Sequence, residues 1–258
     1  MDNQCLKDQV ALITGAGSGI GRASALLFAK YGACIVVADI NGLMGEETAT
    51  LIKQQGGKAI YVNVNIAKAG DCQHMVAVAE QVFGGLHILF NNAGVMHPND
   101  GDITSLEEKT WDLTLSVNAK GVFLGCKYGI PALTRSGGGS VINISSFVAL
   151  RGSSTANIAY GASKAAIISL TRDLAAMYAK KNIRVNALCP GPTLTESFQH
   201  YLEDVPEREK KYLDLIPMGH FADTKEIAKA ALFLASSSSS YMTGATLVVD
   251  GGITATYS

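Results

Sequence analysis

The stretch Thr14-Gly15-Ala16-Gly17-Ser18-Gly19-Ile20-Gly21 decides which fold this chain is expected to adopt. It follows a short apolar run, 10–13, and it opens a segment of helical period, 19–31. A glycine-rich turn between a strand and a helix lets the backbone approach a pyrophosphate, and the first amides of the helix carry partial positive charge. The stretch fits TGxxxGxG, whereas GxGxxG fits in no register. We therefore expect a dinucleotide-binding turn, the alternative being a merely flexible loop.

Short apolar runs alternate with longer segments of helical period along the whole chain. The predicted strands are 10–13, 34–39, 59–64, 88–91, 140–144, 183–187 and 246–249, and the predicted helices are 19–31, 43–55, 70–83, 107–134, 157–181 and 224–236. This alternation is typical of βαβ units, and near-continuous apolar strands suit a sheet covered on both faces. We predict a doubly wound, Rossmann-like α/β fold with a seven-stranded parallel sheet and helices on both faces. Because no linker divides the chain, we expect one domain over residues 1–258.

Two of the predicted helices begin with a capping-box pattern. Ser105 precedes Glu108 by three residues, and Asp223 precedes Glu226 by three. In such a box the first side chain accepts from a free amide of the first turn and the carboxylate reaches back. Both pairs are therefore expected to mark helix starts.

The composition excludes several classes of protein. The chain has 258 residues, of which 48% are hydrophobic and 17% charged, with a formal net charge of −1. This is a globular composition, and the scattered lysines and arginines provide no field for a polyphosphate backbone, so we expect no nucleic-acid partner. No stretch approaches the roughly 18 apolar residues of a spanning helix, and the first ten residues, MDNQCLKDQV, lack the apolar region of a secretory signal. We expect no membrane association.

The cysteines and histidines predict neither disulfides nor a metal site. The five cysteines are odd in number and never in CxxC spacing, and the five histidines form no HxxxH pair. A reducing compartment fits these cysteines best. We therefore expect a cytoplasmic protein without a bound metal.

Asp39 ends the second predicted strand, 18 residues after Gly21. A carboxylate there can accept hydrogen bonds from both hydroxyls of an adenosine ribose, which favours NAD. A 2′-phosphate about 4 Å away would cost on the order of several kcal/mol at an effective dielectric near 20. Neither Ser18 nor Ile40 supplies a cation to offset that repulsion, and Arg22 is the one nearby cation that would permit some NADP use. The structural alternative is that Asp39 caps the next helix.

Tyr160 and Lys164 are spaced i, i+4 on the predicted helix 157–181, so their side chains share one face. That pair is a weak pattern alone, but other motifs accompany it in order. They are 14–21, Asp39, Asn91-Asn92-Ala93-Gly94, Asn118, Asn143-Ile144-Ser145-Ser146, Tyr160-Gly161-Ala162-Ser163-Lys164, Arg184-Val185-Asn186, Pro190-Gly191, Thr243-Gly244 and Val249-Asp250-Gly251-Gly252. With these motifs the chain resembles the compact single-domain branch of the short-chain dehydrogenase/reductase family from about Val10 to Gly252.

The resemblance implies a catalytic group of four residues. Tyr160 would be the general acid/base that exchanges a proton with the substrate oxygen. Lys164 and the oxidised nicotinamide would favour its phenolate, and Lys164 would also hold the nicotinamide ribose. Ser146 would orient the substrate carbonyl or hydroxyl, with Ser145 as the competing serine. Asn118 would help to hold a water-linked proton relay to Lys164.

The same resemblance implies a cofactor site along the carboxyl ends of the strands. Its expected residues are Gly15, Ser18, Gly19, Ile20, Gly21, Asp39, Ile40, Asn65, Ile66, Asn92, Ala93, Gly94, Tyr160, Lys164, Pro190, Gly191, Thr193 and Thr195. Three positions depart from the family pattern: Asn65 and His87 each stand where an Asp is usual, and Glu196 stands where a Pro is usual. We expect these departures to alter the shape of the pocket and not the chemistry.

The most direct reading is an NAD(H)-dependent alcohol dehydrogenase or carbonyl reductase acting on a secondary alcohol or its ketone. A reductase of 3-oxoacyl thioesters of the acyl-carrier-protein type shares every motif and is the enzymatic alternative. An alternative of another class is a dinucleotide-sensing regulator without turnover, whose expected mark is loss of Tyr160 or Lys164.

Eight of the twelve residues 203–214 are charged, and 196–215 stands where the family carries its substrate lid. We also expect a homotetramer, or at least a homodimer, from apolar and small residues on more than one face of 107–134 and 157–181.

Overall fold

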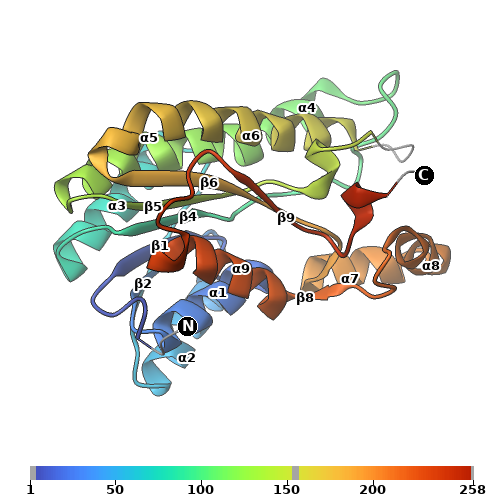
Figure 1. Ribbon diagram of the computed structural model, residues 1–258. Coiled ribbons are helices and arrows are strands. Elements are labelled where there is room, and N and C mark those ends of the chain that lie inside the picture. Colours follow the sequence, from blue (N-terminus) through green and yellow to red (C-terminus); the bar gives the residue numbers. More distant parts are fainter. Residues whose placement is uncertain (1–3, 153–156, 257–258) are drawn as a thin grey trace.

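The computed structural model describes residues 4–152 and 157–256. Seven parallel strands form one sheet in the order β3-β2-β1-β4-β5-β6-β9 (Figure 1). Their bounds are β1 (Val10–Thr14), β2 (Cys34–Asp39), β3 (Lys58–Asn63), β4 (Ile88–Asn91), β5 (Gly139–Ile144), β6 (Ile183–Pro190) and β9 (Thr246–Val249). All seven predicted strands are present and parallel, which confirms the predicted fold.

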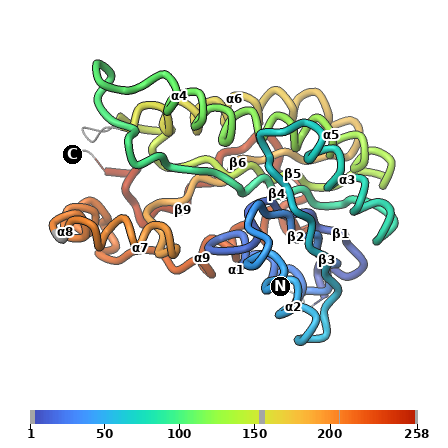
Figure 2. The backbone as a smooth tube through the Cα atoms, turned by 180° about the vertical axis from the view of Figure 1, so that it is seen from behind, coloured from blue at the N-terminus to red at the C-terminus, as the bar shows by residue number. Residues whose placement is uncertain are grey.

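Helices cover both faces of the sheet. On one face lie α1 (Gly19–Lys30), α2 (Gly42–Gln54) and α9 (Thr224–Ala235), and on the other lie α3 (Ala69–Phe83), α4 (Glu108–Leu115), α5 (Gly121–Arg135) and α6 (Ile158–Tyr178) (Figure 1). Beyond the carboxyl ends of the strands, α7 (Glu196–Glu203) and α8 (Pro206–Leu215) project from the body, as the view from behind also shows (Figure 2). A short pair of strands, β7 (Thr193–Leu194) and β8 (Ala222–Asp223), closes the base of this projection.

The sheet separates two layers of hydrophobic core. In β1, Val10 and Leu12 pack on the side of α3, α5 and α6, whereas Ala11 and Ile13 pack on the side of α1, α2 and α9. Successive side chains of a strand point to opposite faces, so a strand buried on both sides has no polar face. This explains why the strands read as continuous apolar runs.

Two helix predictions need correction. The predicted helix 107–134 contains a π-helical turn, Ser116–Lys120, between α4 and α5. Ser105 does not cap α4, because its hydroxyl donates to the Asp102 carbonyl, and the helix starts after Glu107 without a side-chain cap. The second capping box, at Asp223 and Glu226, is confirmed. Both patterns have the same spacing, so spacing alone does not show which of them caps a helix. At Ser105 the local turn around Asp102 prevents capping.

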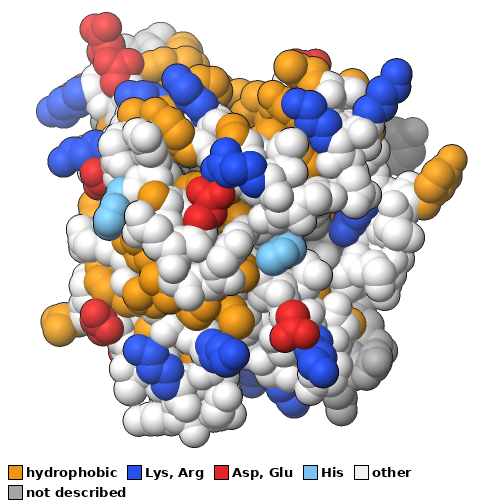
Figure 3. Space-filling model, turned by 90° about the vertical axis from the view of Figure 1, so that its left-hand side faces the viewer, with side chains coloured by type: hydrophobic (Ala, Val, Ile, Leu, Met, Phe, Trp, Pro, Cys, Tyr) orange, Lys and Arg blue, Asp and Glu red, His pale blue; other side chains and the backbone are white. Residues whose placement is uncertain are grey.

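Charged side chains stabilise this fold little. The described residues contain four ion pairs, Arg22–Glu47, Lys109–Glu107, Arg135–Glu80 and Lys210–Asp214, and all of them have at least one exposed partner. Exposed pairs contribute about 0–1 kcal/mol each. On the face drawn in Figure 3, basic and acidic side chains are interspersed among apolar ones and form no patch of one sign.

His87 joins the amino ends of two central strands. The Val10 N–H donates to His87 Nδ1 (3.0 Å), and the His87 N–H donates to the Val10 carbonyl (2.9 Å). Burial lowers the pKa of this imidazole below 6.5. The unfolded chain therefore binds the proton more readily than the folded protein. The stability that His87 contributes is complete above the unfolded pKa and is lost as the pH falls through the folded value.

We expect the free energy of unfolding to decrease between about pH 7 and pH 5, and His87→Asn to flatten part of that decrease. The Asn side-chain oxygen can accept from Val10 N–H and does not titrate. His74, which is exposed, provides the control: His74→Asn should keep the wild-type slope. Denaturant titrations across this pH range measure the effect, and equal slopes for His87→Asn and the wild type would contradict it.

Candidate active site

The glycine-rich turn lies at the carboxyl end of β1, where the strand order reverses between β1 and β4. Gly15 has a φ of +64°, and a Cβ on it would lie 2.9 Å from the Cα of Ala93. A Cβ on Gly21 would overlap the carbonyl oxygen of Gly15. Both positions therefore require glycine. Ligands of doubly wound sheets bind in the crevice at such a reversal.

The first turn of α1 is not capped by a side chain. Ser18 is the N-cap residue, but its hydroxyl makes no capping hydrogen bond, and the first turn, which includes Ile20, contains no acidic residue. Helix amides left in this way favour an anion. The narrow glycine turn and this helix start together fit the pyrophosphate of a dinucleotide.

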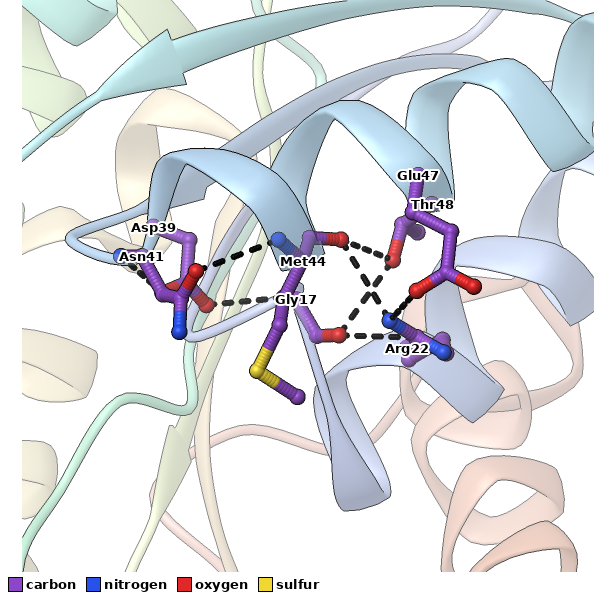
Figure 4. A network of polar contacts seen from close by, with 7 residues as sticks. All are labelled: Gly17, Arg22, Asp39, Asn41, Met44, Glu47 and Thr48. Atoms are coloured by element: carbon purple, nitrogen blue, oxygen red, sulfur yellow. Dashed lines mark hydrogen bonds and ion pairs between the residues drawn. The ribbon is translucent and has the colours of Figure 1, made fainter.

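Asp39 is held at the end of β2 by two backbone amides (Figure 4). Its Oδ2 accepts from the Gly17 N–H (2.7 Å) and its Oδ1 accepts from the Asn41 N–H (2.8 Å). The N-cap of α2 is Asn41, whose Oδ1 accepts from Met44 N–H (3.2 Å), so capping of that helix does not account for Asp39. Ile40 beside it is 65% exposed. The carboxylate thus lies against the glycine-rich turn.

Arg22 is already occupied by protein groups (Figure 4). Its Nε donates to the Gly17 carbonyl (2.7 Å), and its Nη2 pairs with Glu47 (2.6 Å). The guanidinium side chain is 21% exposed and the Glu47 side chain 59%. A ligand phosphate would have to compete with Glu47 for this cation.

The segment after β4 is fastened to the glycine-rich turn. The Asn92 and Ala93 N–H groups both donate to Thr14 Oγ1 (3.0 Å each), and Asn92 Nδ2 donates to the Thr14 carbonyl (3.0 Å). A Cβ on Gly94 would lie 3.2 Å from Asn118 Oδ1 and 3.3 Å from Lys164 Nζ. This segment therefore connects the glycine-rich turn with the predicted catalytic residues Asn118 and Lys164.

Asn65 and Ile66 are largely committed to local structure. The Asn65 N–H donates to Asp71 (2.9 Å), and its Oδ1 accepts from the Ala67 N–H (3.0 Å). Ile66 packs against the start of α5, where a Cβ on Gly121 would lie 2.6 Å from its Cδ1. Both residues lie at the carboxyl edge of the sheet, just after β3.

The segment after β6 forms the opposite wall. Pro190 ends β6, and a Cβ on Gly191 would lie 2.7 Å from the Cα of Asp250. Thr193 Oγ1 donates to the Gly191 carbonyl (2.9 Å). Thr195 caps α7, and its methyl carbon would lie 3.0 Å from a Cβ on Gly19. Of the predicted residues of this segment, Thr195 thus lies beside the start of α1.

Tyr160, Ser146 and Lys164 meet at the carboxyl end of β5. The Ser146 side chain lies beside the Tyr160 phenol, and Lys164 Nζ lies 5.5 Å from the centre of the Tyr160 ring. Ser145, the competing serine, donates its hydroxyl to the Lys164 carbonyl (2.7 Å) and so serves the backbone of α6. Of the two serines, only Ser146 contacts the phenol.

Asn118 lies in the π-helical turn and is fully buried. Its Oδ1 accepts from the Val95 N–H (2.8 Å), and its Nδ2 donates to the Val95 carbonyl (2.9 Å) and to Ser163 Oγ (3.0 Å). Ser163 in turn donates to the Tyr160 carbonyl (2.7 Å). Asn118 thus connects the segment after β4 to α6. Single π turns within helices occur frequently at functional sites.

Burial controls the protonation of the Tyr160–Lys164 pair. Desolvation raises the pKa of the Tyr160 phenol above 10, although the hydrogen bond with Ser146 opposes this rise. Desolvation also lowers the pKa of Lys164, to about 8. Lys164 Nζ donates to the Ile144 carbonyl (3.1 Å) and is 3% exposed. Without cofactor, burial therefore favours the protonated phenol.

Sequence reasoning missed two buried residues of this region. Cys189, on β6, is fully buried near Ser145 and Ser146, and burial raises the pKa of its thiol. Asp100 is 6% exposed and accepts from two amides of α6. Asp100 stands in a loop without a recognisable spacing, so only its burial reveals it.

Aromatic side chains join the two projecting helices. The Phe198 ring on α7 contacts the rings of Tyr201, Tyr212 and Phe221 at centroid distances of 5.3–6.1 Å. The Arg208 guanidinium lies 4.1 Å from the centre of the Tyr201 ring. Phe198 therefore packs within this cluster, and Leu194, at the start of the projection, is 39% exposed.

Among the described residues, no group of three or more His, Cys, Asp and Glu side chains is placed to hold a metal ion. No helix in the described ranges combines the length and the apolar character needed to cross a membrane.

Comparisons with known proteins agree with this geometry. The crystal structure of a short-chain type dehydrogenase/reductase from Mycobacterium marinum matches with a TM-score of 0.92 at 30% identity, covering 99% of each chain. A family model described as enoyl-(acyl carrier protein) reductase matches residues 15–254. The chain belongs to the short-chain dehydrogenase/reductase family.

Sequence relatives in this family carry different activities in their names. An uncharacterized oxidoreductase of Thermotoga maritima is 42% identical over 96% of this chain and 98% of its own length. Cyclohexanol dehydrogenase of an Acinetobacter strain is 38% identical, covering 96% and 95%. A 3-oxoacyl-acyl-carrier-protein reductase of Thermotoga maritima is 37% identical, covering 96% and 98%. This short-chain dehydrogenase/reductase is therefore an oxidoreductase, and its family typically binds a nicotinamide dinucleotide.

Proposed function

We propose that this short-chain dehydrogenase/reductase transfers a hydride between NAD(H) and a secondary alcohol or its ketone, with Tyr160 as the general acid/base. The observation that carries this proposal is the partly buried Tyr160 phenol, which has the Ser146 side chain and Lys164 Nζ beside it. A non-catalytic dinucleotide sensor has no need of this arrangement.

Each residue of the group would have one task. Tyr160 donates its proton to the ketone oxygen in reduction and accepts the alcohol proton in oxidation. Ser146 holds that oxygen by a hydrogen bond. Lys164 supplies positive charge beside the phenol and donates hydrogen bonds to the nicotinamide ribose. Asn118 holds the segment after β4 over the Lys164 amine. The bound cofactor supplies or accepts the hydride.

The choice of NAD over NADP is supported by charge. The Asp39 carboxylate lies against the glycine-rich turn, where it would accept from the ribose hydroxyls and repel a 2′-phosphate. Arg22, the one cation that sequence reasoning kept open for NADP, is paired with Glu47. The proposed cofactor contacts comprise all the residues predicted from the sequence. Asn65 and Ile66 would contact the cofactor mainly through backbone atoms and apolar packing, because the Asn65 side chain is engaged locally.

A secondary alcohol or ketone is supported by cyclohexanol dehydrogenase among the relatives. The reductase of 3-oxoacyl thioesters is the second candidate, since a protein of that name is also related. An assay of NADH formation from cyclic and linear secondary alcohols, alongside NADH and NADPH oxidation with a 3-oxoacyl thioester, tests both. Turnover of the thioester alone, or of no substrate, would contradict the proposal.

The proposal extends to the setting of the enzyme. We infer one domain that carries both the cofactor site and the catalytic group, in the cytoplasm. Support comes from the single sheet shared by both groups and from the cysteines, all five of which are free.

We expect 196–215 to be the least protected segment in hydrogen exchange without ligands, and to gain protection with NADH and substrate. The segment is rich in charge, and its aromatic cluster packs mainly within itself. Exchange mass spectrometry of the free and ternary forms measures this. Full protection without ligands would instead support an ordinary solvated helix pair.

We expect a homotetramer, or at least a homodimer. In the single chain Leu113 and Phe123 are each 48% exposed, and Ala162, Ala165 and Ala166 form an exposed strip on α6. Apolar surface of this kind marks association sites.

Other apolar residues of α5, Val122, Leu124 and Cys126, are buried within the subunit. The other interface of a tetramer would be formed by β9 with 253–258, of which the last two residues lie outside the described ranges. Light scattering coupled to size exclusion is the measurement. A stable active monomer at micromolar concentration would contradict the prediction.

A further inference from the structure

Asp100 lies in the loop between β4 and α4 and is buried to 6% exposure. Its Oδ1 accepts from the Ala159 N–H (3.0 Å), and its Oδ2 accepts from the Tyr160 N–H (2.8 Å). Both carboxylate oxygens are thus bonded to the first turn of the helix that carries the proposed proton donor.

These two amides occupy the positions that a helix N-cap normally serves. The N-cap residue of α6 is Asn157, whose side chain makes no capping hydrogen bond. A cap accepts from the second or third residue of the helix, which here are Ala159 and Tyr160. Asp100 therefore caps α6 from about sixty residues away in the sequence, and its negative charge faces the positive end of the helix.

The loop that carries Asp100 is fixed at its other end as well. Asn118 makes two hydrogen bonds with the backbone of Val95, and it also donates to Ser163, whose hydroxyl donates to the Tyr160 carbonyl. The Tyr160 backbone is thus held on its N–H by Asp100 and on its carbonyl by Ser163. The two contacts together fix the position and direction of the residue.

We propose that Asp100 is a positioning residue for catalysis: it holds the backbone of Tyr160 so that the phenol stays against Ser146 and Lys164. The inference rests on the proposed function of Tyr160. Hydrogen bonds from amides to a carboxylate are stronger than neutral ones, and a displacement of about 1 Å at a reacting group can cost roughly 100-fold in rate. Loss of the cap should therefore act on turnover and leave cofactor binding intact.

The experiment compares Asp100→Ala and Asp100→Asn with Asp102→Asn. Asp102 is an exposed residue of the same loop, and its carboxylate accepts only from the N–H and the hydroxyl of Thr104, within its own turn. We expect Asp100→Ala to lower kcat by about 10- to 100-fold, with the Kd of NADH within twofold of the wild type. Asp100→Asn keeps one acceptor oxygen, so its kcat should lie between that of Asp100→Ala and that of the wild type. The kcat of Asp102→Asn should match that of the wild type.

A merely structural cap predicts a different pattern. If Asp100→Ala lowers Tm while its kcat stays within twofold of the wild type, the inference is overturned. Parallel loss of kcat and NADH affinity in both Asp100 variants would also overturn it, because that pattern reports general damage.

A double-variant cycle identifies the route of the effect. If Asp100 acts through Tyr160, Asp100→Ala should lower the residual kcat of Tyr160→Phe by less than twofold. A full additional loss would overturn the inference while leaving the proposed role of Tyr160 in place. Conversely, wild-type turnover by Tyr160→Phe alone would reject the proposed function itself.

Discussion

Tyr160→Phe is expected to lower kcat by about 10²- to 10⁴-fold while leaving the Kd of NADH within a few-fold of the wild type. The substitution removes only the phenolic hydroxyl, which in the proposed function carries the transferred proton and lies beside Ser146. The ring, its contact with Lys164 and the glycine-rich turn all remain. Steady-state kinetics with a turned-over alcohol and fluorescence titration with NADH measure the two quantities.

The matched control is Tyr178→Phe. Tyr178 lies on the same helix and is partly buried against the core, and the Lys181 amine lies 5.3 Å from its ring centre. A phenylalanine keeps both contacts, so we expect wild-type kinetics. Near-wild-type turnover by Tyr160→Phe would reject the assignment.

The pH profile gives a second measure of the same prediction. Oxidation of an alcohol requires the phenolate, and burial raises the pKa of the phenol, so kcat/KM for oxidation should increase with pH toward that pKa. Tyr160→Phe should abolish this rise in its residual activity. A wild-type rate of oxidation that falls from neutral to alkaline pH would contradict the assignment.

Asp39→Ala is expected to raise the KM for NAD by at least about tenfold and to raise kcat/KM for NADP. The carboxylate would no longer accept from the ribose or repel a 2′-phosphate, and an unfavourable interaction of several kcal/mol at about 4 Å would disappear. The Gly17 N–H, now bonded to Asp39, would also become free to meet the phosphate. Kinetics with both cofactors give the ratio.

Glu47→Gln sharpens this test. It removes the negative partner of Arg22, 2.6 Å from its guanidinium, without touching Asp39. Combined with Asp39→Ala it should increase the preference for NADP further, whereas alone it should leave NAD preferred. A wild-type enzyme that already prefers NADPH in kcat/KM would contradict the proposed cofactor.

The sequence determined the features that depend on neighbours within a few residues. Apolar strands and helical periods gave the seven-stranded sheet, because a strand buried on both faces needs a continuous apolar run. The glycines of the turn at 14–21 were readable because no Cβ fits at Gly15 or Gly21. The Tyr160–Lys164 pair was readable because a spacing of four puts both residues on one helix face.

The tertiary structure decided what depends on distance in space. Ser105 and Asp223 carry the same capping pattern, yet only Asp223 caps, because Asp102 engages the Ser105 hydroxyl. Arg22 was read as a free cation, but α2 brings Glu47 to it. The pKa of Tyr160 rises because desolvation depends on how much protein surrounds the phenol, which no spacing encodes. Asp100 reaches the start of α6 only through the course of a loop, and that contact carries no local signature in the sequence.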